Sequence, residues 1–193
     1  MILLVGQAPS RTSDPASALS PAGRSGRRLL ELSGLSEEAF GARALRINLS
    51  DRWPGKNGKG DRFPRLIDDG VLSLIAASAM IVFVGRGVAE RMLGASVARE
   101  LEPCCWYFSH RPRKLYAVLP HPSGVNRWWN DAANVRRAKR FLREALSDAR
   151  ETRPSRRPGP RAPAARSSTT AGERPRSGRG PSRARSEARS GRG

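Results

Sequence analysis

Residues 120–130 join a histidine to basic and aromatic side chains directly after an apolar run. His121 is one of only two histidines in the chain, and residues 115–119 before it are apolar enough to form a strand. Two prolines, a serine and a glycine restrict the loop that carries this histidine. An imidazole in such a loop can face a bound group, while the arginine and tryptophans that follow contact a polyanion. The segment therefore indicates a site rather than a piece of the core.

Basic and aromatic side chains continue along the chain beyond this loop. Trp128 and Trp129 suit stacking on the bases or sugars of single-stranded or opened DNA, or anchoring of the last helix, and we expect one residue in each role. Five basic residues and no acidic one occupy positions 136–143. Such a run is often only a solvated helix face, but the absence of acids here favours contact with DNA phosphates. The predicted phosphate track consists of Arg127, Arg136, Arg137 and Arg140.

The segments that must position these residues alternate between strand and helix. Apolar runs predict strands at residues 2–5, 44–49, 80–84 and 114–119, and residues 109–113 are predicted to form a polar, hairpin-like loop. Periodic apolar residues predict helices at 23–35, 66–78, 85–94 and 131–149. This alternation predicts an α/β fold with three layers, α/β/α, around a central, mostly parallel four-stranded sheet.

Three of the predicted loops follow the carboxyl ends of strands, which is where open parallel sheets bind ligands. They cover residues 6–10, 48–52 and 121–126. We therefore expect these three loops to form one site.

Composition divides the chain into two parts. Residues 150–193 hold thirteen arginines and three glutamates, a net charge of +10, and no lysine, aromatic, methionine or branched aliphatic residue. With nothing to bury, this segment is predicted to be a disordered basic tail that binds phosphates in a salt-dependent way. A solubilising role or a coding bias are the alternatives for it. Residues 1–149 are predicted to form one domain, and they too are basic, with a net charge of +9.

The sequence also disfavours several classes of protein. No apolar run reaches the length of a membrane span, and residues 1–5 lack the pattern of a signal peptide, so we expect no membrane partner. Cys104 and Cys105 are adjacent, and two such residues make neither a zinc nor an iron–sulfur site, so we expect structural thiols and no metal. We expect a monomer in the cytoplasm, at a bacterial nucleoid or in a virus-infected bacterial cell.

The three loops also carry a resemblance to a known family. The sequences Gly6-Gln7-Ala8-Pro9-Ser10 and His121-Pro122-Ser123, with Asn48 between them, resemble the motifs of the uracil-DNA glycosylase superfamily. Residues 23–30 and 82–94 resemble stretches of the iron–sulfur-bearing branch of that family. The resemblance covers roughly residues 1–146 in the correct order.

The resemblance implies an enzyme that removes a base from DNA, which needs a pocket, a wedge and a grip on phosphates. It makes Asn48 the reader of a pyrimidine edge, and His121 the group that stabilises negative charge as the N-glycosidic bond breaks. The alternatives are an asparagine that caps a turn and a loop histidine bonded to backbone. The remaining implied contacts are Gly6, Ala8, Pro9 and Ser10 with the substrate, and Pro122, Ser123, Gly124, Val125, Asn126 and Arg127 with DNA, Val125 being the wedge.

The chain departs from the family pattern at the residues that activate water. No carboxylate stands at Gln7 or Ala8, and an amide at Gln7 can orient a water but cannot accept its proton. Either bond breaking depends mainly on stabilisation of the leaving group and some activity survives without a base, or Asp14 or Asp51 supplies the base. Pro21 replaces the phenylalanine that stacks on the flipped base in the iron–sulfur branch. The four cluster cysteines of that branch are absent, so no cofactor is expected.

Two functional classes follow from these features. The first is a monofunctional DNA glycosylase that hydrolyses the N-glycosidic bond of uracil or a related modified pyrimidine and acts on single- or double-stranded DNA. The second is a catalytically inactive nucleic-acid-binding protein that keeps the fold. Hydrolysis of a free nucleoside or nucleotide is a weaker third option, because the net charge and the tail favour a polymer.

Overall fold

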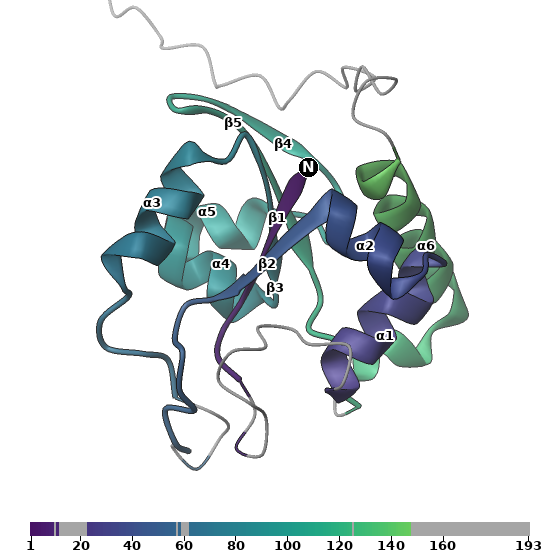
Figure 1. The fold of residues 1–193 in the computed structure, drawn as a ribbon, viewed down its shortest axis with the longest axis horizontal. Coiled ribbons are helices and arrows are strands. Elements are labelled where there is room, and N and C mark those ends of the chain that lie inside the picture. The colour runs from purple at the N-terminus through teal and green to yellow at the C-terminus, as the bar shows by residue number, and fades with distance from the viewer. Residues whose placement is uncertain (10, 12–22, 57, 59–61, 125, 148–193) are drawn as a thin grey trace, which may run out of the picture. The chain divides into compact units, whose positions relative to one another are not determined.

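The computed structural model describes residues 1–9, 11, 23–56, 58, 62–124 and 126–147. Figure 1 shows these residues as a twisted sheet with helices on both of its faces. Four groups of predictions lie outside the described residues. They concern Ser10, Asp14 with Pro21, Val125 and the basic tail at residues 150–193.

The sheet has five strands in the order β2-β1-β3-β5-β4. The first three in the chain are β1 (Ile2–Gly6), β2 (Ala44–Asn48) and β3 (Met80–Val84), and they pair in parallel, as does β5 (Arg113–Leu119) with β3. The prediction of a mostly parallel α/β sheet is thus confirmed.

The predicted number of four strands is wrong, because Tyr107–His110 forms a further strand, β4, antiparallel to β5. Only part of residues 109–113 is therefore a loop. β4 is a short edge strand whose side chains alternate between half-buried and exposed, so it lacks the continuous apolar run by which the other strands were predicted.

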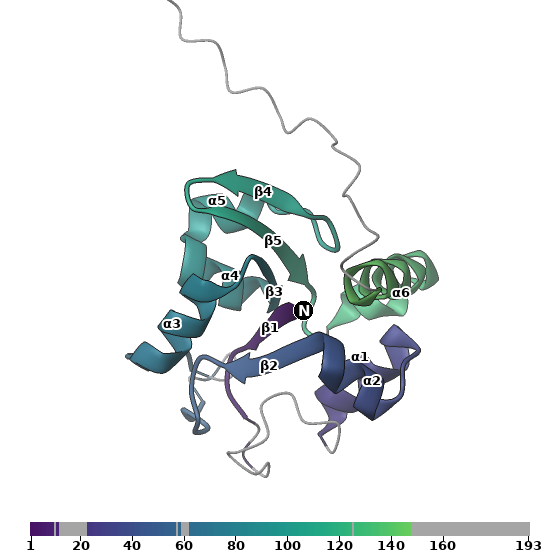
Figure 2. The ribbon, with the colours of Figure 1, turned by 45° about the horizontal axis from the view of Figure 1, so that its top comes forward.

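Helices cover the two faces of the sheet in separate groups (Figures 1 and 2). One face carries α1 (Arg24–Ser33), α2 (Glu37–Arg43) and α6 (Ala132–Leu146), and the 3₁₀ helix η1 (Arg127–Asn130) precedes α6. The other face carries α3 (Asp69–Ala77), α4 (Arg86–Leu93) and α5 (Ala95–Glu100). The three layers predicted from the alternation of elements are therefore present.

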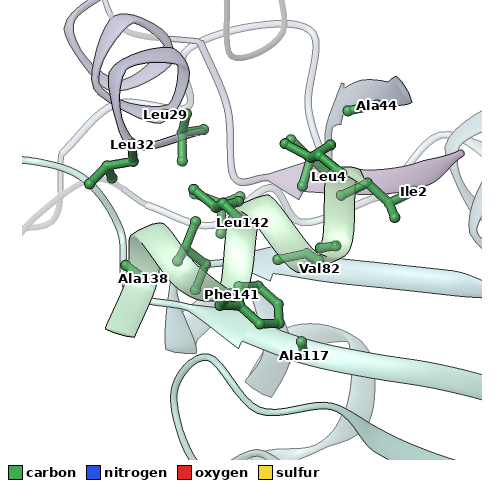
Figure 3. Close-up of a cluster of buried hydrophobic side chains, with 14 of the residues drawn as sticks. Ile2, Leu4, Leu29, Leu32, Ala44, Val82, Ala117, Ala138, Phe141 and Leu142 are labelled. Atoms are coloured by element: carbon green, nitrogen blue, oxygen red, sulfur yellow. The ribbon is translucent and has the colours of Figure 1, made fainter. Parts of the chain in front are cut away.

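The alternation of side chains along β1 explains these two layers. Ile2 and Leu4 point to the α1–α6 face, where Figure 3 shows them beside Leu142 and the other residues of one core cluster. Leu3 and Val5 point to the opposite face and join the cluster under α3, α4 and α5. Successive residues of a strand face opposite sides, so a strand buried on both faces must be apolar throughout.

Side-chain caps explain where several helices begin. The carboxylate of Asp68 accepts hydrogen bonds from the backbone of Gly70 and Val71, so α3 begins at Asp69 rather than at residue 66 as predicted. Asp131 caps α6 in the same way, through the backbone N–H of Ala133 at 2.7 Å. Gly34 ends α1 in the left-handed region at φ 72°, which glycine adopts without strain.

The two cysteines lie at the junction between the sheet and α6. Cys104 is buried, and its backbone N–H donates to the carbonyl of Val118 at 2.8 Å. Burial raises the pKa of the Cys104 thiol to about 12, although the nearby charge of Arg137 acts in the opposite direction. Cys105 is half-buried, and its sulfur accepts a hydrogen bond from Arg137 Nη2 at 3.0 Å.

We predict that a disulfide-type thiol reagent at pH 8 will modify Cys105 well before Cys104 in the native protein. Cys104 stays protonated at that pH because its pKa lies far above it, and a buried thiol is also inaccessible. Reaction can be followed by absorbance, with total thiol measured in denaturant and each site assigned with Cys104→Ala and Cys105→Ala. Equal rates for both thiols in the folded protein would contradict this assignment.

Within the described part of the chain, no helix is long and apolar enough to cross a membrane.

Candidate active site

The strand register brings the ends of four strands to one edge of the sheet. Gly6, the last residue of β1, pairs with Asn48, the last residue of β2. Val84 at the end of β3 pairs with Leu119 at the end of β5. Because all four strands run in parallel, the described parts of the three predicted loops follow this same carboxyl edge.

The loop that carries His121 is tied down through its backbone. The carbonyl oxygen of His121 accepts hydrogen bonds from Asn126 Nδ2 at 3.1 Å and from Trp129 Nε1 at 2.8 Å. Asn126 also caps η1, because its side-chain oxygen accepts from the backbone N–H of Trp128 at 3.1 Å. Pro122 is buried, and Ser123 accepts the backbone N–H of Asn126 at 3.2 Å. These contacts set the direction in which the imidazole leaves the backbone.

A glycine at the end of the neighbouring strand packs beside this histidine. Gly85 has φ 111°, and its N–H donates to the carbonyl of Leu119 at 2.8 Å. A Cβ atom built on Gly85 would lie 3.5 Å from the Cβ of His121. This Cβ would make only an ordinary van der Waals contact with the histidine, so it is the backbone conformation at Gly85 that favours glycine.

Asn48 ends β2 with a buried polar atom. The residue is only 8% exposed, and its Oδ1 has no hydrogen-bond partner among the described residues. A buried acceptor without a partner costs on the order of 1–3 kcal/mol. An asparagine that caps a turn would use this oxygen, so the observation favours a ligand-reading amide over the structural alternative.

Gln7 connects the first loop to the segment that follows β2. Its Nε2 donates to the backbone carbonyl of Arg62 at 2.8 Å. Next to Arg62, the ring of Phe63 lies so close to Gly87 that a Cβ there would be 2.8 Å from the ring. Phe63 is 37% exposed, and Gly87 belongs to the first turn of α4, directly after its N-cap Gly85. An aromatic ring therefore stands at the same edge as Gln7 and His121.

Phe63 was not predicted as a site residue from the sequence. Residues 50–64, which follow the second predicted strand, indicate only a polar, glycine-rich segment. A signal was available in Phe63-Pro64, an apolar residue at the end of this segment. The other substrate-binding predictions fall on small residues of the first loop. The carbonyl of Gly6 accepts the backbone N–H of Leu49 at 2.9 Å, Ala8 is half-buried and Pro9 is buried.

Of the two aspartates predicted as alternative bases, the structure describes only Asp51. Asp14 lies outside the described residues. Asp51 follows β2 closely, but its side chain is 80% exposed and lies 3.8 Å from the guanidinium of Arg52. Among the residues that the structure describes, no three histidine, cysteine, aspartate or glutamate side chains form a group that could hold a metal ion.

Some of the predicted DNA-binding residues are exposed, whereas Arg137 contacts other side chains of the protein. Arg127, Arg136 and Arg140 are exposed, as is Gly124. Arg137 turns instead to Glu102, with 3.1 Å between guanidinium and carboxylate, and to the sulfur of Cys105. It therefore links α6 to the segment before β4.

The two tryptophans also differ. Trp129 is 5% exposed and belongs to the core under α6. Trp128 packs edge-on against it at 4.7 Å between ring centroids, and it is only partly buried. Trp129 is thus the anchor that the sequence led us to expect of one tryptophan, and Trp128 keeps part of its ring accessible.

A small-residue first loop, a buried amide and a backbone-anchored histidine meet at the carboxyl edge of a parallel sheet. This arrangement is typical of α/β domains that bind their ligands at that edge. The model of the Uracil DNA glycosylase superfamily matches residues 1–150, and the chain belongs to this superfamily. Proteins of this superfamily act on DNA as glycosylases. A search of curated proteins found no match to the chain.

We predict that Gly85→Ala destabilises the protein by about 1–3 kcal/mol, because alanine rarely adopts this positive φ. Gly41→Ala is the matched control. Gly41 lies within α2 with open space around it, so alanine there should stabilise by about 0.5–1 kcal/mol. Chemical denaturation of the three proteins gives the free energies of unfolding. Equal stability of Gly85→Ala and the unchanged protein would contradict the role given to this glycine.

Proposed function

We propose that this protein is a monofunctional DNA glycosylase that hydrolyses the N-glycosidic bond of uracil or a related modified pyrimidine. The observation that carries the proposal is the buried Oδ1 of Asn48, which has no partner among the described residues and lies at the ligand-binding edge of the sheet. A pyrimidine with an N–H on its edge would supply the missing donor. Membership of the superfamily supports the same class of reaction.

The arrangement of the strands suits a flat base held between two side chains. Asn48 ends β2 and His121 follows β5, and two strands, β1 and β3, lie between them. Three strand spacings separate the two strand axes by about 14 Å. If the side chains of Asn48 and His121 extend toward each other across this distance, a pyrimidine ring fits between them and can form hydrogen bonds with both. The base must first leave the DNA stack to enter it.

In this proposal the protein acts chiefly on the leaving base. As the bond to the sugar breaks, negative charge develops on the base carbonyl oxygen, and His121 stabilises it by donating a hydrogen bond. The anchored carbonyl of His121 keeps the imidazole in place, so little reorganisation is needed. Phe63, beside Gly87, forms an aromatic wall on which the ring stacks.

Water attack is the less developed half of the site. Gln7 orients a water through its amide but does not take its proton, and its Nε2 is already bonded to the Arg62 carbonyl. Asp14 or Asp51 accepts the proton. Since an oxocarbenium-like sugar reacts readily with water, stabilisation of the leaving base carries most of the rate enhancement.

The competing proposal is a nucleic-acid-binding protein that keeps the fold without the reaction. The lack of a carboxylate at Gln7 and Ala8 and the exposed arginines of α6 favour it. In both proposals the basic residues 150–193 add salt-dependent contacts to phosphates.

We predict that His121→Ala lowers the rate of uracil excision at least about 100-fold, because it removes the donor to the leaving base. His110→Ala is the control, since His110 is the other histidine and lies exposed on β4. Uracil-, hypoxanthine- and hydroxymethyluracil-containing oligonucleotides are incubated with each protein and cleaved with alkali. DNA affinity should be retained in both variants. Absence of cleavage across the panel by the unchanged protein, with DNA binding intact, would favour the competing proposal.

A second prediction tests whether the Asn48 amide recognises a ligand or has a structural role. Asn48→Ala should leave the free energy of unfolding within about 1 kcal/mol or raise it, because it removes a buried acceptor without a partner among the described residues. Asn126→Ala should cost about 1–2 kcal/mol, since Asn126 caps η1 and donates to His121. Denaturant unfolding measures both. A larger loss for Asn48→Ala than for Asn126→Ala would make Asn48 structural.

A further inference from the structure

A basic groove lies along α1 and α6, in the helical layer that covers one face of the sheet. It consists of two neighbouring pockets of about 400 and 420 Å³. Residues of both helices line the first pocket, residues of α6 alone line the second, and Lys139 lines both. Seven basic and two acidic side chains line the two pockets together. The seven basic residues are Arg24, Arg27, Arg28, Arg136, Lys139, Arg140 and Arg143.

The helical period explains why these charges gather on one face of each helix. Arg24, Arg27 and Arg28 occupy positions i, i+3 and i+4 of α1, and they therefore share one face of that helix. On α6 the same spacing joins Arg136, Lys139, Arg140 and Arg143. Leu29 and Leu32 of α1 pack in one core cluster with Ala138 and Leu142 of α6, which holds the two charged faces side by side. Among the described residues, none of the seven basic groups forms an ion pair.

One end of this α1–α6 groove adjoins the candidate active site. The guanidinium of Arg28 lies 4.8 Å from the ring centroid of Trp129. The indole N–H of the same tryptophan donates to the backbone carbonyl of His121 at 2.8 Å. Two direct contacts therefore connect the groove to the loop that holds the histidine. The groove continues along the helices to Arg143, which lies near Gly34 at the end of α1.

The lining of the groove identifies the chemistry of its occupant. Six of the seven basic residues are arginines, whose planar guanidinium groups bind phosphate oxygens in pairs. The floor of the first pocket includes apolar Leu32 and Val135. Each pocket is at the lower end of the size range of small-ligand sites, about 300–1,000 Å³. Such a lining suits phosphates at the rim and a sugar or a base on the apolar floor.

We propose that the α1–α6 groove binds single-stranded DNA next to the nucleotide held at the active site. In a duplex the bases are paired and stacked inside, so only phosphates would reach the rim and the apolar floor would stay unused. An unpaired strand can place its bases in the pockets and its phosphates on the arginines. The inference rests on the proposed function in taking DNA as the partner, and it adds a strand preference. The α1 arginines are not among the residues that the sequence predicted to contact DNA.

The test compares binding of undamaged oligonucleotides to the full-length chain by fluorescence anisotropy at several salt concentrations. The ligands are single-stranded DNA, the same sequence as a duplex, the same sequence as RNA, and a single strand of abasic units. The groove variant is Arg27→Glu with Lys139→Glu. The control is Arg99→Glu with Arg113→Glu, which makes the same charge change at exposed positions on α5 and at the start of β5.

We expect single-stranded DNA to bind more tightly than the duplex, the RNA and the abasic strand. The groove variant should lose at least about tenfold in affinity for single-stranded DNA, and its salt slope should become shallower by about 1.4 for two lost phosphate contacts. The control should change affinity by less than about threefold. Thermal unfolding should be alike for all three proteins, because the four substituted side chains are exposed.

Three results would overturn the inference. They are equal losses in the groove variant and the control, duplex or RNA bound at least as tightly as single-stranded DNA, or an abasic strand bound as well as the normal one. Because undamaged DNA is used, these outcomes do not depend on catalysis. A protein that excises no base but passes this test would lose the proposed function and keep the groove.

Discussion

The parallel pairing of β1 with β2 and of β3 with β5 is the constraint on which the site depends. It sets Gly6 opposite Asn48 and Val84 opposite Leu119, so four strands end at the same edge of the sheet. A shift of β2 by one residue would turn the side chain of Asn48 to the opposite face of the sheet. The apolar residues that face both helical layers prevent such a shift, because it would bury the polar side chains of the strand. Core packing therefore positions the functional groups.

The site combines a histidine whose backbone is held by hydrogen bonds with an asparagine whose side-chain oxygen has no hydrogen-bond partner among the described residues. The backbone of His121 is held by Asn126 and Trp129, and Gly85 packs beside its side chain. Asn48, in contrast, buries an acceptor that finds no donor in the described part of the chain. A folded protein bears such a cost where a ligand repays it. In the proposed mechanism, stabilisation of the leaving base and recognition of its edge are therefore better supported by this site than activation of water.

Much of this architecture was predictable from local patterns in the sequence. The predicted superfamily and α/β class are both confirmed. They could be predicted because short apolar runs that end in small or polar residues indicate buried parallel strands and the loops that follow them. β4 was missed because an edge strand with one exposed face carries little apolar signal. The seven-residue α2 and the six-residue α5 are too short to show a helical period.

Features that depend on tertiary contacts could not be predicted in this way. The burial of the Asn48 oxygen follows from strand register, and the approach of Phe63 to Gly87 follows from the path of the loop after β2. Arg137 belongs to a uniformly basic run in the sequence, yet its contacts with Glu102 and Cys105 set it apart from its neighbours. The meeting of α1 and α6 arginines likewise arises only when the two helices pack together.

The central claim is that Asn48 and His121 hold the same pyrimidine, and an NMR titration with free uracil tests it most directly. The chain has only two histidines, so the imidazole signals can be assigned with a His110→Gln variant. We expect uracil to shift the His121 signals and leave those of His110 in place, and we expect Asn48→Ala to abolish the shift. A His121 signal that does not respond to uracil, or that responds equally in Asn48→Ala, would contradict a shared site.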